Sequence, residues 1–191
     1  MKKTLLFLSL IIVTITATAQ VEAGLRSGFT LSGSFNSMSE LPGSKSSIGY
    51  RLGYAMEYNL SERFYIGSGV VQTLKGSAKT ADFSVGLKYW YLQVPLNIGG
   101  RIALNRQDTY LFGQVGPYVS YAVAASKYDV FGYGRITGEK FDWGFDAKAG
   151  VEFGDLQIHV GYDLGMANVW KYALNENVKH RSVFIGLTSF F

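Results

Sequence analysis

The stretch Tyr91–Ile102 restricts the fold of this chain more than any other, because its side chains alternate between two kinds. The large apolar residues occupy one parity, while polar residues and Pro95 occupy the other. The apolar set is Leu92, Val94, Leu96, Ile98 and Ile102. A period of two residues is typical of a β-strand with one apolar and one polar face. The length suits a tilted strand that crosses a membrane, which needs about 9–11 residues.

The same alternation recurs along the chain and predicts eight strands in total. They are Val21–Ser32, Ile48–Leu60, Phe64–Leu74, Tyr89–Ile102, Thr109–Ala124, Phe141–Phe153, Leu156–Met166 and His180–Phe191. Long polar connections, at 34–47, 75–88, 126–140 and 168–179, alternate with short turns. Outer-membrane barrels show this asymmetry, with short periplasmic turns and long external loops. We therefore predict an all-β fold, an eight-stranded antiparallel up-and-down transmembrane β-barrel.

The N-terminus has the three parts of a secretory signal peptide. Lys2 and Lys3 form a basic start, an apolar run follows over 5–13, and small residues up to Ala19 form a cleavage site. The run is too short for a membrane-spanning helix, which needs about 20 apolar residues. We predict a signal peptide at 1–19 and a single barrel domain at 20–191.

Aromatic residues collect at both ends of the predicted strands, as in the two interfacial girdles of a membrane barrel. Those near the long loops are Tyr50, Trp90, Tyr121, Phe141 and Trp143, and those near the short turns are Tyr58, Tyr110, Phe153 and Phe191. The alternative is a soluble, lipocalin-like barrel, in which the apolar face points inward and the charged face outward. The signal peptide and the girdles favour the membrane barrel.

Two details of the strand pattern stay open. Phe64–Leu74 has apolar residues on both parities, so the sequence does not determine its inward face. Pro95 removes a backbone donor from a strand that a closed barrel pairs on both sides. We predict a bulge or a local break of the ladder at Pro95.

Composition excludes several classes of function. The formal net charge is only +4, and Lys2 and Lys3 leave with the signal peptide, so no nucleic-acid partner is expected. The chain has no cysteine. It also has no metal-ligand spacing, phosphate loop or nucleotide fingerprint, so we expect no metal and no cofactor.

The polar parity of the strands carries charges of both signs, which we expect to face the lumen. This lumen charge cluster is Arg26, Arg51, Glu57, Arg101, Asp142, Asp146, Lys148, Glu152 and Asp163. The two-residue turn Gly154-Asp155 sets a register that places Asp146 opposite Asp163. Facing carboxylates need a cation between them or a proton. We expect Arg26, Arg51 or Lys148 to supply that cation, in a structural ion cluster. The alternative is a proton or ion path.

The long loops hold candidates for contacts with other molecules, because aromatic and charged residues are mixed there. These candidates are Tyr128, Phe131, Tyr133, Arg135, Trp170 and Tyr172. The alternative is that they only cap the barrel or touch lipid headgroups. A lipid-cleaving site would need His, Ser and an acid on the outer surface, and His180 with Ser182 matches this poorly. We expect His159 to be a hydrogen-bonded lumen residue, and no catalytic residues.

Four short stretches, Tyr91–Leu96, Gly116–Tyr118, Asp142–Gly144 and Gly161–Gly165, resemble the porin-like outer-membrane β-barrel domain family of Gram-negative bacteria, which includes the PorT-like proteins. Gln93 stands where many relatives have Glu. The resemblance implies an outer-membrane location and no shared activity, although some relatives take part in protein secretion. It also implies that Phe191 is a C-terminal signal for the outer-membrane assembly machinery.

The expected function is non-enzymatic: a monomeric structural or docking barrel in the cell envelope. An eight-stranded barrel is only wide enough for side chains to fill it, so no open pore is expected. The alternative function is a narrow porin-like channel or a path for small solutes. The expected partners are outer-membrane lipid, the assembly machinery during biogenesis and another envelope protein.

Overall fold

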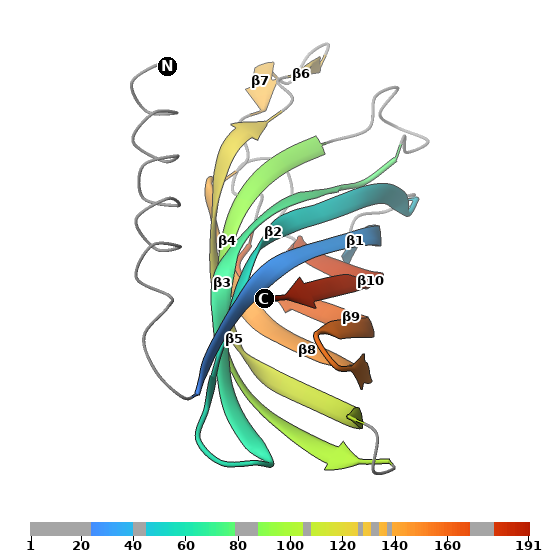
Figure 1. Ribbon diagram of the computed structural model, residues 1–191. Coiled ribbons are helices and arrows are strands. Elements are labelled where there is room, and N and C mark those ends of the chain that lie inside the picture. The colour runs from blue at the N-terminus through green and yellow to red at the C-terminus, as the bar shows by residue number, and fades with distance from the viewer. Residues whose placement is uncertain are drawn as a thin grey trace.

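In the computed structural model, eight long antiparallel strands close into a barrel (Figure 1). The structure describes residues 24–39, 45–78, 88–104, 108–125, 128–130, 134–136, 139–168 and 178–191. The barrel strands are β1 (Leu25–Ser39), β2 (Ser47–Asn59), β3 (Phe64–Gly76), β4 (Lys88–Ala103), β5 (Thr109–Ala125), β8 (Phe141–Phe153), β9 (Leu156–Gly165) and β10 (Lys179–Phe190). Each pairs with the next along the chain, and β10 pairs with β1. The predicted eight-stranded antiparallel up-and-down barrel is confirmed.

The connections keep the predicted difference between the two ends of the barrel. The short turns are 60–63, 104–108 and 154–155. The long connection between β5 and β8 contains a small hairpin, β6 (Tyr128–Val130) paired with β7 (Gly134–Ile136), where a loop was predicted. This hairpin lies at the upper end of Figure 1, and the β2–β3 turn lies at the opposite end.

The predicted signal peptide, residues 1–19, lies outside the described residues, as do residues 21–23 of the first predicted strand. The described part of that strand begins at Leu25. Within the described ranges, no helix has the length and hydropathy needed to cross a membrane.

The prediction that residues 34–39 belong to a loop is wrong, because β1 continues to Ser39. Ser34 and Asn36 are buried, whereas Phe35 between them is 59% exposed. Asn36 accepts a hydrogen bond from the Ser182 hydroxyl at 2.6 Å and donates one to the Leu74 carbonyl at 3.1 Å. Serine and asparagine therefore fit a strand whose inward face is polar.

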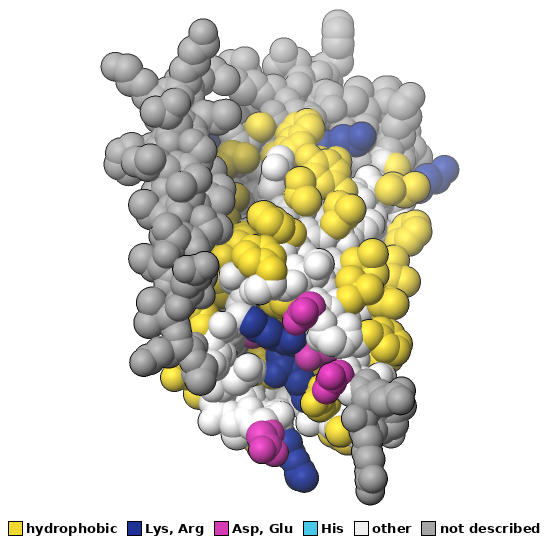
Figure 2. Space-filling view, in the orientation of Figure 1, with side chains coloured by type: hydrophobic (Ala, Val, Ile, Leu, Met, Phe, Trp, Pro, Cys, Tyr) yellow, Lys and Arg dark blue, Asp and Glu magenta, His cyan; other side chains and the backbone are white. Residues whose placement is uncertain are grey.

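The two faces of the barrel wall have the reverse of the polarity found in a soluble protein. Large apolar side chains point outward and are exposed, as Ile48 (75%) and Ile102 (68%) show. Charged side chains point inward, and Asp142 (0%) and Arg51 (6%) are buried. Figure 2 shows hydrophobic side chains over the wall and a group of acidic and basic side chains in the lower half of the view. The lipocalin-like alternative is therefore wrong.

The sequence did not determine which side chains of β3 point into the lumen, and their burial now shows it. Tyr65, Val71 and Thr73 are buried in the lumen, whereas Phe64 and Val70 are exposed. The inward parity continues past Thr73 to Lys75, which was predicted to begin a loop and is instead a buried residue of β3.

The ladder is interrupted at Pro95, as predicted, but without a bulge. On the β3 side, pairing stops at Ser68–Leu96 and resumes at Val71–Gln93 in the same register. The Ser68 hydroxyl donates to the Pro95 carbonyl at 2.9 Å. The register shift of β4 occurs instead at Trp90/Tyr91, against β5. Proline therefore removes ladder bonds locally and leaves the register unchanged.

Candidate functional site

The lumen next to the short turns is closed by two arginines that share two glutamates. We call Arg26, Glu57, Arg101, Glu152 and Gln157 the turn-side layer. Arg26 Nη2 lies 2.7 Å from Glu57 Oε2 and 2.6 Å from Glu152 Oε2. Arg101 also contacts both glutamates, with Nε 3.1 Å from Glu152 Oε2. Gln157 Nε2 donates to Glu57 at 3.2 Å and to Glu152 at 2.8 Å. The layer thus cross-links five strands.

Aromatic rings support both arginines of the turn-side layer. The Arg26 guanidinium lies 4.1 Å from the centroid of the Phe190 ring, and the Arg101 guanidinium lies 4.2 Å from that of Tyr65. A guanidinium over an aromatic face gains cation–π energy while its N–H groups remain free for carboxylates. The rings therefore fix the planes of the two arginines.

Arg51 contacts both facing aspartates in a middle layer formed by Arg51, Asn97, Asp146 and Asp163. The β8–β9 hairpin turns at Gly154 (φ +56°) and pairs Asp146 with Asp163, as predicted. Arg51 Nη1 lies 2.7 Å from Asp163 Oδ1, and Nη2 lies 3.7 Å from Asp146 Oδ2. Asn97 donates to Asp146 Oδ1 at 2.6 Å. Of the three predicted cations, Arg51 is the one that lies within ion-pair distance of both aspartates.

A loop-side layer of Lys75, Tyr118 and Asp142 lies beyond Asp163, toward the long loops. Lys75 Nζ lies 3.5 Å from Asp142 Oδ2 and 3.3 Å from Asp163 Oδ2. The Tyr118 hydroxyl donates to Asp142 Oδ2 at 3.2 Å. Lys75 is fully buried, so this layer joins the middle layer through a charge that contacts aspartates of both.

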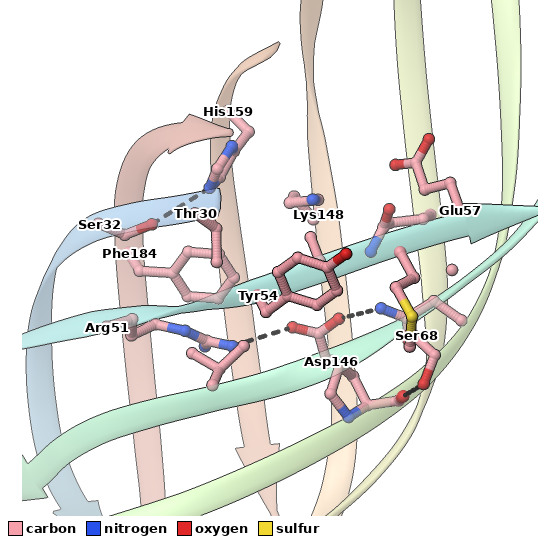
Figure 3. Close-up of a pocket in the computed structure, with 17 residues that line it drawn as sticks. Thr30, Ser32, Arg51, Tyr54, Glu57, Ser68, Asp146, Lys148, His159 and Phe184 are labelled. Carbon is pink, nitrogen blue, oxygen red and sulfur yellow. Dashed lines mark hydrogen bonds and ion pairs between the residues drawn. The ribbon is translucent and has the colours of Figure 1, made fainter. Parts of the chain in front are cut away.

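A small cavity lies between the turn-side and middle layers (Figure 3). Its volume of about 50 Å³ is enough for a few water molecules, since one needs roughly 10–15 Å³ measured in this way. Lys148 lines it and makes no ion pair within the part of the chain that the structure describes; its Nζ lies 5.6 Å from the Phe112 ring centroid. Between these two layers of described residues, the lumen is therefore filled by side chains around a space the size of a few waters.

The charges that face the lumen balance in the described residues. Five are basic and five acidic: Arg26, Arg51, Lys75, Arg101 and Lys148 against Glu57, Asp142, Asp146, Glu152 and Asp163. Buried charges are stable only when they are paired and hydrogen-bonded. Balance on this scale favours a structural network, because a filter for one sign of ion would carry an excess of the opposite sign.

The structure brings all nine residues of the predicted cluster into the lumen and adds one that the prediction missed. Eight of the nine lie in ion pairs, and Lys148 faces the cavity. Lys75 was missed because its neighbours 76–80 are typical of a loop. The signal that could have found it is parity, since Lys75 follows Val71 and Thr73 at steps of two.

The histidines lie in the lumen, and in the described residues neither ring is hydrogen-bonded to both a serine and an acid, since Nδ1 of each has no partner. The His159 Nε2 lies 3.2 Å from the Ser32 hydroxyl, so His159 is the hydrogen-bonded lumen residue that was predicted. His180 is buried beside Tyr91, with 3.3 Å between its Nε2 and the tyrosine hydroxyl. Ser182 bonds Asn36 instead. Across the described residues, no three His, Cys, Asp or Glu side chains are grouped to hold a metal ion.

The loop candidates are only partly covered by the described residues. Tyr128 lies in β6 and Arg135 in β7, where the structure describes the backbone alone. The other four, Phe131, Tyr133, Trp170 and Tyr172, lie outside the described residues. Phe191 follows the end of β10, and its amide donates to the Ser27 carbonyl of β1 at 2.9 Å. The terminal residue therefore lies at the seam where β1 and β10 close the barrel.

The apolar outer wall and the polar lumen agree with the comparison against known families. Residues 16–171 match the family described as outer membrane protein beta-barrel domain. The chain belongs to this family. The protein is thus an integral β-barrel of the outer membrane, whose short turns face the periplasm and whose long loops lie outside.

Two solved structures of outer-membrane proteins, neisserial surface protein A and OprG, show the same fold. The chain is 12% identical to neisserial surface protein A. The match covers 88% of this chain and 100% of that one, and its TM-score is 0.53. For OprG from Pseudomonas aeruginosa the identity is 12%, the coverages are 89% and 97%, and the TM-score is 0.52. The comparison also found Ail of Yersinia pestis, with 17% identity, coverages of 89% and 100%, and a TM-score of 0.47. No curated protein matches the sequence.

Proposed function

We propose that this outer-membrane barrel has a non-enzymatic, structural and docking role in the cell envelope. The filled lumen carries the proposal. Ion pairs connect opposite sides of the barrel at three levels, and the cavity between two of them holds about 50 Å³. A solute would have to break several buried ion pairs to pass, and each costs several kcal/mol once one partner is left alone. Contacts with other molecules are therefore left to the loops and the periplasmic rim.

Six loop residues are the proposed contact positions on the outer side: Tyr128, Phe131, Tyr133, Arg135, Trp170 and Tyr172. The periplasmic rim offers a second surface around the β2–β3 turn. A cavity of about 990 Å³ opens there, lined among others by Glu62, Arg63 and Tyr110. Membership of the PorT-like subgroup, and recognition of Phe191 by the assembly machinery, stay predictions.

Conductance in planar bilayers tests the closed lumen. We expect the refolded protein to be silent. The double variant Arg101→Ser/Glu152→Ser, which opens only the turn-side layer, should also be silent, because the ion pairs of the middle and loop-side layers still cross the lumen. Stable channels in the unmodified protein, with an ion selectivity that changes in Arg51→Gln, would establish the narrow-channel alternative.

Site-specific photo-crosslinking in cells tests the docking role. A photoreactive residue at Tyr133 or Trp170 should give discrete protein adducts. The control position is Val119, which lies on the outer wall and is 49% exposed. Equal labelling at the loop and wall positions would contradict docking through the loops, and would leave the result on the lumen unaffected.

A further inference from the structure

The outer wall contains a row of small residues that runs across three neighbouring strands. Gly100 of β4 pairs with Gly113 of β5, and Gly113 pairs with Ala149 of β8. Large side chains stand at both ends of this row, since Phe64 pairs with Gly100 and Val160 pairs with Ala149. The outer surface of the wall is therefore recessed over these three strands, compared with the strands on either side.

Two adjoining hollows result from this difference in side-chain size. The one nearer the periplasm has a volume of about 540 Å³ and includes Ile102 and Leu111 in its lining. The one nearer the centre of the wall has about 570 Å³ and includes Ala147 and Tyr162. Both are lined by Gly113 and Ala149, so they form one continuous apolar groove.

Measured along the membrane normal, the groove extends over part of one membrane leaflet. It extends along β5 from Leu111 to Val115, which is about 13 Å at about 3.3 Å per residue. With a strand tilt of about 40°, this corresponds to about 10 Å of height, against about 15 Å for one leaflet's hydrocarbon. Because this wall lies within the membrane, lipids surround it.

A basic residue stands at the periplasmic end of the groove. Arg63, in the β2–β3 turn, lines the lower hollow, is exposed, and makes no ion pair with any residue that the structure describes. The turn holds its backbone, because the Arg63 carbonyl accepts from the Arg101 amide at 2.7 Å and its amide donates to the Ser61 hydroxyl at 3.3 Å. In contrast, Arg26, Arg51 and Arg101 are occupied by lumen carboxylates. A guanidinium binds phosphate oxygens through two parallel hydrogen bonds.

We infer that this groove binds one glycerophospholipid of the periplasmic leaflet. An acyl chain lies over Gly113 and Ala149, and the lipid phosphate lies on the Arg63 guanidinium. The inference depends on the outer-membrane location and not on whether the lumen is closed.

Matched variants separate the groove from the rest of the wall. Gly113→Leu fills the groove, and a Cβ at this position meets only the Lys148 carbonyl, at 4.0 Å. Gly33→Leu is the control, because Gly33 lies on the exposed wall of β1 and a Cβ there meets nothing within 4 Å. Arg63→Gln removes the phosphate contact, and its control is Arg181→Gln, an exposed arginine of β10 at the opposite rim.

Native mass spectrometry of the detergent-purified barrel, titrated with dioleoyl phosphatidylethanolamine, measures the binding. We expect one lipid per barrel, bound about tenfold less tightly by Gly113→Leu and by Arg63→Gln and unchanged in both controls. Dioleoylglycerol, which lacks the phosphate, should bind the unmodified protein as weakly as phosphatidylethanolamine binds Arg63→Gln.

Two results would overturn the inference. One is equal lipid binding by the unmodified protein and all four variants, each shown to be folded by its heat-modifiable mobility in electrophoresis. The other is a dimer of the unmodified protein that Gly113→Leu dissociates, which would show that a second copy occupies the groove.

Discussion

The two ends of the lumen solve the same problem of buried charge in different ways. In the turn-side layer, Arg26 and Arg101 each contact both glutamates, and Arg26 Nη2 lies 2.6 Å from Glu152 Oε2. In the loop-side layer, Lys75 reaches Asp142 at 3.5 Å and leaves the Oδ1 atom of this aspartate without a partner. A guanidinium presents five donors in a planar fork, whereas an ammonium is a single point charge. The periplasmic end is therefore the more rigidly closed of the two.

The largest effect is expected from Arg101→Met. It leaves Glu57 and Glu152 to share Arg26 in a buried site, and removing one partner of a buried pair costs about 3–5 kcal/mol. Urea unfolding in lipid vesicles, followed by tryptophan fluorescence, measures the free energy of unfolding. Arg101→Lys is the matched control and should lose less, because the charge remains. A loss below about 1 kcal/mol in Arg101→Met would contradict the rigid closure.

A smaller loss, about 1–3 kcal/mol, is expected from Lys75→Met in the loop-side layer. Asp142 still accepts from the Tyr118 hydroxyl, and Asp163 keeps Arg51. The control is Lys88→Met at the exposed start of β4, which should change the free energy of unfolding by less than about 0.5 kcal/mol. If Lys75→Met lowered the free energy of unfolding as much as Arg101→Met under the same conditions, the two ends of the lumen would be equally strongly closed.

The smallest effect is expected from Gln93→Leu. The substitution removes one hydrogen bond, from Nε2 to Asp163 at 3.3 Å, and also removes an Oε1 atom that has no partner. The two changes oppose each other, so the free energy of unfolding should change by less than about 1 kcal/mol. Its sign refines the comparison: a gain in stability would show that the unpartnered oxygen costs more than the bond contributes.

Alternation alone was enough to predict most of the fold from the sequence. The Gly154-Asp155 turn by itself predicts the pairing of Asp146 with Asp163, because a two-residue hairpin leaves one register. The prediction failed at residues 34–39 and at Lys75, where serine, asparagine and lysine suggested loops. In a barrel with a polar lumen such residues belong to strands, so composition is a poor guide to where these strands end.

The sequence by itself determined the number of strands, their direction and the face on which most side chains lie, since these depend on a period of two residues along a single strand. Only the tertiary structure decided which charges pair. Arg51, Lys75 and Asp163 come from β2, β3 and β9, and barrel closure brings them together across the lumen. Gly100, Gly113 and Ala149 likewise form a groove only because three strands align in register. Which side chains meet across the lumen depends on the closure and shear of the barrel, and no local pattern encodes these.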